Sequence, residues 1–244
     1  MTLSLNSYYL VADGACRKNP GPGGYGLIVA TPDGQVIEFG GHDSQTTNNR
    51  MELMGFYRGL QEIFKLVKSA DASSAPHLKT IHVICDSKYV LDGAAKNVHQ
   101  WSKNGWQLAS GGEVKNQDLW EKILKGLNEF KALDFKFEYE LVKGHSGNDA
   151  NERVDQIAVR FSHEEPIDLY RGSLSAYPIK LTGGAKESFQ AVYLSYVDGK
   201  LLRHKTWDEC QKATHGKKGA KFKKVTNRLQ EQDALESWGI KQST

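Results

Sequence analysis

Hydrophobic and polar residues follow two different periods along the first sixty residues. A short apolar run at 8–13 predicts a strand, and the stretch at 23–41, interrupted by Pro32-Asp33-Gly34, predicts a hairpin. After a polar segment, apolar residues recur at spacings of three and four from Met51 to Phe64, which predicts a helix. The chain is therefore expected to open with antiparallel strands followed by a helix.

Strand and helix patterns alternate from residue 78 onward. A β-branched strand at 78–86 leads into a helix that starts with SKYVLDGA, and an amphipathic helix follows at 119–130. An alternating strand at 135–142 precedes a last helix, VDQIAVRF, whose apolar residues share one face. Because strands come first as an antiparallel set and then interleave with helices, we predict an α/β fold with a mixed sheet flanked by helices.

A second, smaller unit is predicted beyond a stretch of poor periodicity. Two strands flank Asp198-Gly199, a strong hairpin signal, and the segment from Thr206 to Glu209 has the pattern of a capping box. A third strand, AKFKKV, and a helix, LQEQDALESW, complete an α+β unit with a three-stranded antiparallel sheet and two short helices. The predicted organisation is a large domain at 1–165, a linker at 166–188 and a small domain at 189–240.

The composition is that of a globular protein, with 39% hydrophobic and 25% charged residues. No apolar run approaches the ~18–20 residues that span a bilayer, and the N-terminus lacks a secretory pattern. The three cysteines show no metal-type pairing, and their odd number argues against a disulfide framework. These features predict a reducing, cytoplasmic setting without a membrane partner.

Charge is distributed unevenly along the chain. Residues 189–244 hold 11 Lys or Arg against 6 Asp or Glu, and within them 200–224 hold 9 against 2; the remaining residues hold 21 against 23. The basic stretch predicts a docking surface for a polyanion. Charge alone favours a solvated lysine face instead, but aromatic residues interleaved with the lysines favour binding.

Four carboxylates lie where this layout can bring them together. Asp13 ends the first strand and Asp86 ends the strand at 78–86, so parallel neighbouring strands would place them side by side. Glu52 lies in the first turn of its helix, and Asp155 lies at the edge of the buried face of the last helix. Each residue alone is more simply interpreted as a turn, cap or dipole residue. Together they would repel one another and require hard cations, Mg²⁺ or Mn²⁺, as used in two-metal phosphodiester cleavage.

The sequence resembles type 1 ribonuclease H across residues 8–162. The resemblance lies in DGACRKNPGPGGYG, TTNNRMEL, CDSKYV, NQDLW and VKGHSGNDANERVDQIA. It implies a five-stranded mixed sheet flanked by helices and hydrolysis of the RNA strand of RNA–DNA hybrids, with two divalent metal ions, leaving 3′-hydroxyl and 5′-phosphate ends. It also implies metal-binding, catalytic roles for Asp13, Glu52, Asp86 and Asp155.

His145, between two glycines, would assist proton movement or product release according to the same resemblance. The ordinary pKa of an imidazole lies near physiological pH, which suits that role. The alternative is that His145 only packs its loop.

The resemblance also assigns substrate contacts. Cys16, Asn19 and Asn49 would reach the minor groove beside the RNA strand, and Thr47 and Asn116 would hold a phosphate of the DNA strand. Trp101 and Trp120 would belong to an aromatic and basic segment along the DNA, although Trp120 is interpreted equally well as a core residue and Trp106 better as structural. Sparse basic residues in the segment predict weak substrate holding by the large domain alone.

The C-terminal unit resembles the hybrid-binding domain of eukaryotic ribonucleases H and of caulimovirus viroplasmin. The matching residues are Tyr193, Trp207, Phe222, Lys223 and Lys224, and the resemblance implies aromatic contact with the DNA strand and lysine contact with phosphates. Stacking contributes ~1–3 kcal/mol per base. The alternative is that the aromatic residues form the core of a very small domain. Double-stranded RNA is a further expected ligand, and the protein is expected to be a monomer.

Two competing functions remain open at this point. One is a nucleic-acid-binding protein of the same fold without hybrid-specific cleavage, which the intact carboxylate set argues against. The other is a nuclease or recombinase that cuts DNA, which the segments DGACRKNPGPGGYG and TTNNRMEL argue against. The sequence does not fix the biological task or the preference between Mg²⁺ and Mn²⁺.

Overall fold

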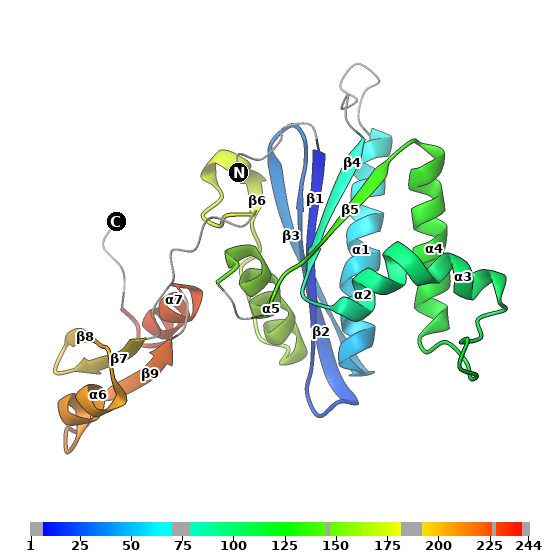
Figure 1. Ribbon diagram of the computed structural model, residues 1–244. Helices are drawn as coiled ribbons and strands as arrows, with labels where there is room; N and C mark the ends of the chain where they lie inside the picture. Colours follow the sequence, from blue (N-terminus) through cyan, green and yellow to red (C-terminus); the bar gives the residue numbers. More distant parts are fainter. Residues whose placement is uncertain (1–6, 70–78, 145–146, 182–191, 226–227, 241–244) are drawn as a thin grey trace. The chain divides into compact units, whose positions relative to one another are not determined.

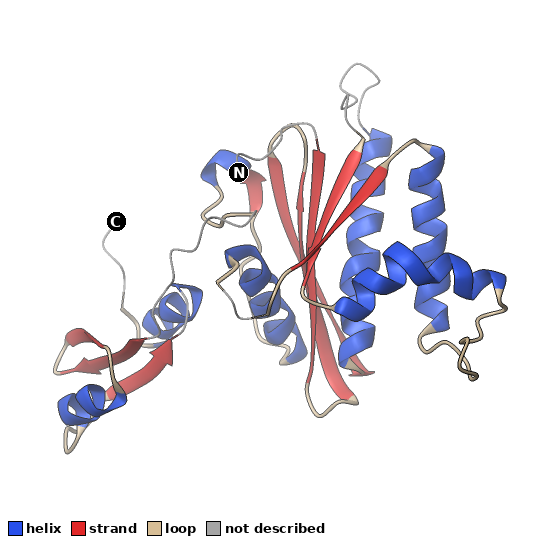
Figure 2. Ribbon diagram, in the orientation of Figure 1, coloured by secondary structure: helices blue, strands red, loops and turns tan. Residues whose placement is uncertain are grey.

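The computed structural model divides into two units, Met1–Gly183 and Gly184–Thr244. It describes residues 7–69, 79–144, 147–181, 192–225 and 228–240. Figure 1 shows both units and Figure 2 their helices and strands. No helix within these ranges combines the length and the apolar character needed to cross a membrane.

The large unit is built on a mixed sheet. Its strands are β1 (Ser7–Cys16), β2 (Gly21–Ala30), β3 (Gln35–Thr46), β4 (Thr80–Cys85), β5 (Lys136–Leu141) and β6 (Arg171–Ser173). They lie in the order β5-β4-β1-β2-β3-β6. β1 pairs with β4, and β4 with β5, in parallel; the other pairs are antiparallel. The predicted ribonuclease H type of sheet is confirmed, with a sixth strand at its edge.

Helices cover both faces of this sheet. They are α1 (Asn48–Ser69), α2 (Lys88–Asp92), the π-helical turn η2 (Gly93–Asn97), α3 (Val98–Lys103), α4 (Gln117–Ala132) and α5 (Asp149–Ser162). Figure 1 shows α5 on one side of the sheet and α1 with α4 on the other. Along β1, Leu10 and Ala12 face the α1 side, whereas Tyr9 and Val11 face the α5 side. Burial on both faces explains why β1 has an almost continuous apolar run.

Helix α5 lies unusually close to the sheet. A Cβ atom on Gly26 of β2 would come within 2.3 Å of the carbonyl oxygen of Val154. Val154, Ile157 and Ala158 are fully buried on this side of the helix. The close approach fixes the helix that carries Asp155 directly against β2, the neighbour of the strand β1 that carries Asp13.

Residues 166–181 differ from the predicted linker. β6 pairs with the edge of β3, the short 3₁₀ turn η3 (Leu174–Ala176) follows, and Tyr177 and Leu181 are buried in the core on the α5 side. A three-residue strand is too short to show a hydrophobic period, so its pairing partner rather than its own pattern determines it. The compact large unit therefore extends beyond residue 165, while the extent of the linker remains a prediction.

The small unit has the predicted elements. Strands β7 (Val192–Val197), β8 (Lys200–His204) and β9 (Lys221–Val225) form an antiparallel sheet in the order β8-β7-β9, with helices α6 (Trp207–Thr214) and α7 (Arg228–Ser237). Asp198 and Gly199 form the hairpin turn with φ values of 50° and 77°. The Thr206 hydroxyl caps α6 by accepting from the Glu209 N–H. Leu194, Val225 and Ala234 form the core.

Candidate functional site

Asp13 and Asp86 occupy matching positions on neighbouring parallel strands. The register of β1 and β4 pairs Val11 with Ile84, and each aspartate lies two residues further along its chain. The Gly14 N–H donates to Asp13 Oδ1 at 2.7 Å. The sequence prediction that these strands are parallel neighbours is confirmed, and the common edge brings the two carboxylates together.

Glu52 approaches the same edge from α1. Its Oε1 accepts from Asn48 Nδ2 at 2.9 Å, and its Oε2 accepts from Ser87 Oγ at 2.6 Å. Ser87 directly follows Asp86 in the chain. The first turns of α1 lie close to β1, because a Cβ atom on Gly14 would come within 2.2 Å of the Glu52 nitrogen. A side chain at position 14 would therefore displace Glu52 from Asp13.

The acidic cluster has a strongly unfavourable charge in the absence of cations. The pKa of Asp13 is raised to about 8: burial contributes most, the charge of Asp86 contributes next, and Asp155 and Glu52 add to the effect against the opposing bond from Gly14. Burial also raises the pKa of Glu52, where the bond from Ser87 opposes it and Asp86 reinforces it. Asp13 thus interacts with each of the other three predicted carboxylates, and Glu52 also interacts with Asp86.

A divalent metal ion fits the chemistry of this donor set. The groups are carboxylate oxygens, which hard cations such as Mg²⁺ and Mn²⁺ prefer, and the raised pKa of Asp13 reflects negative charge that a cation would offset. In the described ranges no group of three or more His, Cys, Asp or Glu side chains is arranged so that it could hold a metal ion. The fit is therefore one of charge and ligand type.

Helix α5 contributes two residues to this edge. Asp155 influences Asp13, and Asn151, one turn earlier on the same helix face, donates from Nδ2 to Asp86 Oδ2 at 3.1 Å. The sequence reasoning missed Asn151, although its spacing of four residues from Asp155 was the available signal. Asn151 is only 2% exposed, so its amide has a defined position.

His145 lies outside the described residues. The backbone of the preceding Gly144 lies against the Asp86 carboxylate. The loop that carries His145 thus starts beside the acidic cluster, and the role of the histidine stays a prediction.

Three of the predicted substrate contacts lie around the start of α1. Asn19 and Asn49 are exposed, and Asn19 Oδ1 accepts from the Asn48 N–H at 3.2 Å. The Cys16 thiol donates to the Thr46 carbonyl at 3.4 Å, which links the end of β1 to the end of β3. The structure brings Cys16, Asn19 and Asn49 into one region, as an RNA-facing surface requires.

Arg50 links the two residues predicted to hold a DNA phosphate. Its backbone N–H donates to Thr47 Oγ1 at 3.4 Å, and its Nη1 donates to Asn116 Oδ1 at 3.4 Å. Asn116 has a left-handed backbone with φ 59° at the start of α4, and its Nδ2 donates to the Tyr89 hydroxyl at 3.2 Å. Arg50 also forms a bidentate pair with Asp118, with both distances 2.8 Å. Thr47 and Asn116 therefore lie together.

Trp120 is a core residue, and its predicted contact with substrate is wrong. Its side chain is fully buried, and its Nε1 donates to the Tyr89 hydroxyl at 2.9 Å. Its ring packs edge-on against that of Trp101, with 5.4 Å between the ring centroids. An amphipathic helix pattern does not separate a buried tryptophan from one at the rim. Trp101 is half-buried and keeps a surface that a ligand can reach.

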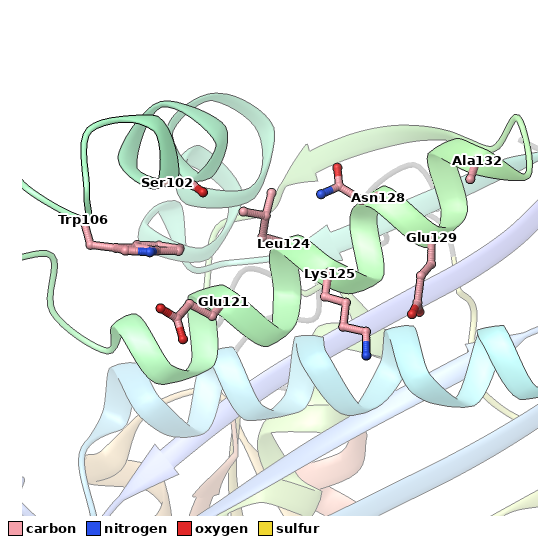
Figure 3. Close-up of a pocket in the computed structure, with 8 residues that line it drawn as sticks. All are labelled: Ser102, Trp106, Glu121, Leu124, Lys125, Asn128, Glu129 and Ala132. Atoms are coloured by element: carbon pink, nitrogen blue, oxygen red, sulfur yellow. The ribbon is translucent and has the colours of Figure 1, made fainter.

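A hollow in the large unit lies away from the acidic cluster. Figure 3 shows it between the segment after α3 and the exposed side of α4, with the ring of Trp106 at one end. None of its lining residues belongs to the predicted site: they are Ser102, Trp106, Glu121, Leu124, Lys125, Asn128, Glu129 and Ala132.

Three aromatic rings form a surface row in the small unit. Tyr193 and Trp207 are 5.7 Å apart between ring centroids, Trp207 and Phe222 are 5.2 Å apart, and Lys224 Nζ lies 5.7 Å from the Tyr193 ring. Trp207 is 39% and Phe222 53% exposed, so neither belongs to the core of this unit. Lys223 and Lys224 lie on the adjacent strand β9 and are exposed. The predicted binding residues are thus gathered on one unit.

Comparisons with known proteins agree with the fold. The RNase H family pattern matches residues 6–163. A Ribonuclease H of Prochlorococcus marinus (strain NATL1A) is 46% identical over 157 residues, covering 64% of this chain and 88% of the relative. One of Thermosynechococcus vestitus (strain NIES-2133 / IAM M-273 / BP-1) is 41% identical over 160 residues, covering 66% and 91%.

A solved structure shows the same architecture. LC9-RNase H1, described as a type 1 RNase H with the type 2 active-site motif, has a TM-score of 0.53 and 26% identity, covering 70% of this chain and 79% of that chain. The family match spans more than half of the chain and contains every residue of the carboxylate site. The chain therefore belongs to the ribonuclease H family.

Proposed function

We propose that this ribonuclease H cuts the RNA strand of RNA–DNA hybrids at the edge formed by β1, β4, α1 and α5. Asp13, Glu52, Asp86 and Asp155 would hold two divalent metal ions, and we expect Mg²⁺, with Mn²⁺ as the alternative. The observation that carries the proposal is the raised pKa of Asp13, about 8, which burial and three neighbouring carboxylates cause. A site of this charge requires cations to work with ionised carboxylates at neutral pH.

When bound, divalent ions would lower the pKa of the attacking water and stabilise the leaving 3′ oxygen. The chain's own residues orient the carboxylates for this task. The Gly14 N–H holds Asp13, Asn48 and Ser87 hold Glu52, and Asn151 holds Asp86. These bonds fix where negative charge is presented, so little rearrangement is needed at the moment of reaction.

We expect His145 to move a proton during product formation or release. Support comes from its place in the chain directly after Gly144, whose backbone lies against Asp86. Replacing His145 with Ala is expected to lower kcat with little change in KM.

Selection of the hybrid would rest on two surfaces of the large unit. Cys16, Asn19 and Asn49 would contact the 2′-hydroxyl side of the RNA strand, which distinguishes RNA from DNA. Thr47 and Asn116, joined by Arg50, would hold a phosphate of the DNA strand. Trp101 would contact the DNA from the end of α3.

The small unit would increase hybrid binding through its aromatic row and its lysines. Tyr193, Trp207 and Phe222 offer ring faces to bases or sugars, and Lys223 and Lys224 offer charge to phosphates. Tethering such a unit raises the effective concentration of hybrid at the cutting site when the connection spans both sites. Double-stranded RNA is the second ligand to test on this unit.

The decisive experiment compares three full-length proteins on a labelled RNA–DNA hybrid in Mg²⁺ across salt concentrations. These are the unaltered chain, Asp86→Asn, and the double variant Trp207→Ala/Phe222→Ala. We expect no cleavage by Asp86→Asn, and cleavage with a raised KM by the double variant. Normal cleavage by Asp86→Asn would reject the carboxylate mechanism. An unchanged KM at every salt concentration would reject a binding role for the aromatic row.

A truncation at residue 165 is a poor substitute for these variants. It would remove β6 together with the buried Tyr177 and Leu181, so a loss of activity would not report on the small unit. Duplex DNA of the same sequence, assayed in parallel, separates hybrid cleavage from DNA cleavage. Binding without any cleavage would favour the alternative of a nucleic-acid-binding protein.

A further inference from the structure

Beyond the family-matched region, the segment 168–177 joins the active-site helix through one buried carboxylate. Glu38 of β3 has a side chain that is 1% exposed, and it lies one residue beyond the last β3–β6 pair, Ile37 with Arg171. The Glu38 N–H donates to the Tyr170 carbonyl at 2.8 Å, and the Tyr170 N–H donates back to Glu38 Oε2 at 2.9 Å. The segment is therefore bonded to β3 by backbone and side chain together.

The same carboxylate holds α5. Arg153 Nε donates to Glu38 Oε1 at 2.9 Å and Arg153 Nη2 to Oε2 at 2.7 Å, and the Tyr177 hydroxyl donates to Oε1 at 2.7 Å. Arg153 Nη2 also donates to the Asp168 carbonyl at 2.6 Å. Burial raises the pKa of Glu38, but the bonds from Arg153, Tyr170 and Tyr177 outweigh burial and lower it overall, so the pair is ionised at neutral pH.

The position of Arg153 on the helix gives this network a consequence for the site. Arg153 and Asp155 are two residues apart and so point about 200° away from each other around the helix axis. Helix α5 contacts β1, β2 and β3. Arg153 is bound on the β3 side, whereas Asp155 acts on Asp13 of β1. The bidentate pair opposes rotation of α5, and rotation would move Asp155 and Asn151.

We propose that Glu38 is a positioning residue, and that the segment 168–177 completes the catalytic unit by fixing, through Arg153, the rotation of the helix that carries Asp155 and Asn151. This inference rests on the proposed function of the carboxylates. It assigns a role in that function to residues beyond 163, where the family match ends. A purely structural role would lower stability and leave the affinity of the site for metal unchanged.

The test uses the full chain and two matched pairs of variants. Glu38→Gln removes the charge that binds Arg153. Glu165→Gln removes the charge that pairs with Arg160, an arginine near the other end of the same helix. Tyr177→Phe removes the hydroxyl bound to Glu38, and Tyr57→Phe removes a hydroxyl on α1 that accepts from Gln61 Nε2 at 2.9 Å. The phenylalanine pair covers the case in which Glu38→Gln does not fold.

Two readouts are required at a temperature where every variant is folded. The first is titration with Mg²⁺ alone by calorimetry, and the second is the Mg²⁺ dependence of kcat and KM on hybrid. We expect Glu38→Gln to weaken Mg²⁺ binding about 10-fold, the lower end of the range for residues that orient metal ligands. Tyr177→Phe should weaken it less, about 3-fold, because the Arg153 pair remains. Both should lower kcat more than they raise KM, and both control variants should match the unaltered chain.

Unchanged Mg²⁺ affinity and kcat in folded Glu38→Gln or Tyr177→Phe would overturn the proposal, whatever the change in melting temperature. Equal losses in the control variants would overturn it as well, because the loss would then not be specific to the bonds that Glu38 forms. Failure of the proposed function is recognised separately. In that case the unaltered chain binds Mg²⁺ normally in calorimetry yet does not cut hybrid, and the Mg²⁺ titration alone decides the role of Glu38.

Discussion

At the scale of single residues, the site is defined by carboxylates whose charge is only partly offset by hydrogen bonds. Among the described residues, one donor holds Asp13, two hold Glu52 and one holds Asp86. The cluster therefore opposes folding when it is ionised and metal-free, and it favours cation binding. Two predictions follow from this balance of charge and orientation.

Replacing Asp13 with Asn is expected to stabilise the metal-free protein, and more so as the pH rises. The folded-state pKa of Asp13 is raised from 3.8 to about 8, so this group costs nothing below pH 3.8 and costs progressively more as the pH rises towards 8. Unfolding by urea in EDTA should show a gain of roughly 1–3 kcal/mol at pH 8 and almost none at pH 4. Added Mg²⁺ should reduce the difference by binding the unaltered chain. A gain that does not depend on pH would contradict the charge argument.

Replacing Asn151 with Ala is expected to lower the cleavage rate about 10- to 100-fold, the range for groups that orient metal ligands. The change removes the donor to Asp86 Oδ2 but leaves the carboxylates in place. Initial rates at several Mg²⁺ concentrations would measure the effect, with Asn128→Ala on the exposed side of α4 as the control. If Asn151→Ala cuts at the normal rate with a normal Mg²⁺ requirement, Asn151 has no orienting role.

At the scale of elements, parallel pairing explains how much of the site could be predicted. The ends of β1 and β4 place Asp13 and Asp86 together, the start of α1 supplies Glu52, and the middle of α5 supplies Asp155. The role of Trp120 was not predictable, because only the packing of α4 against Tyr89 and Trp101 decides which side of an amphipathic helix is buried.

Replacing Trp120 with Ala is expected to destabilise the large unit by about 3–5 kcal/mol, the usual cost of removing a fully buried large aromatic side chain. Urea unfolding followed by circular dichroism would measure it. Phe222→Ala, at an exposed aromatic of the small unit, serves as the comparison and should change stability by less than about 1 kcal/mol. A small loss for Trp120→Ala would mean that α2, α3 and α4 do not depend on this side chain.

At the scale of the whole molecule, we propose that the large unit cuts the hybrid and that the small unit helps to hold it. The large unit carries the acidic cluster and few basic residues in its predicted substrate segment, whereas the small unit carries an aromatic row and lysines. Each lysine–phosphate contact releases counterions, so the contribution of the small unit should depend on salt.

Replacing Lys223 and Lys224 with Ala together is expected to flatten the salt dependence of hybrid binding. Each lost phosphate contact should reduce the slope of log K against log salt concentration by about 0.7–0.9. Both double variants would also carry Asp86→Asn so that they do not cut the hybrid, and hybrid binding would be measured by fluorescence anisotropy. Lys65→Ala/Lys68→Ala, near the end of α1 remote from Glu52, is the control of equal charge. An equal slope for both double variants would show that the lysines of β9 do not contact phosphates.

The sequence by itself determined most of the periodic elements and their order along the chain, because periods of two and 3.6 residues are local signals. It also predicted the four carboxylates, through motifs that resemble those of ribonuclease H. Only the tertiary structure decided that β6 joins the sheet, that Trp120 is buried and that Glu38 binds Arg153. Glu38 and Arg153 are 115 residues apart in sequence. A three-residue strand and a single buried glutamate are too short to show a periodic pattern in the sequence. Both are stabilised by partners far away along the chain, β3 for the strand and Arg153 for Glu38, and a local pattern does not reveal such partners.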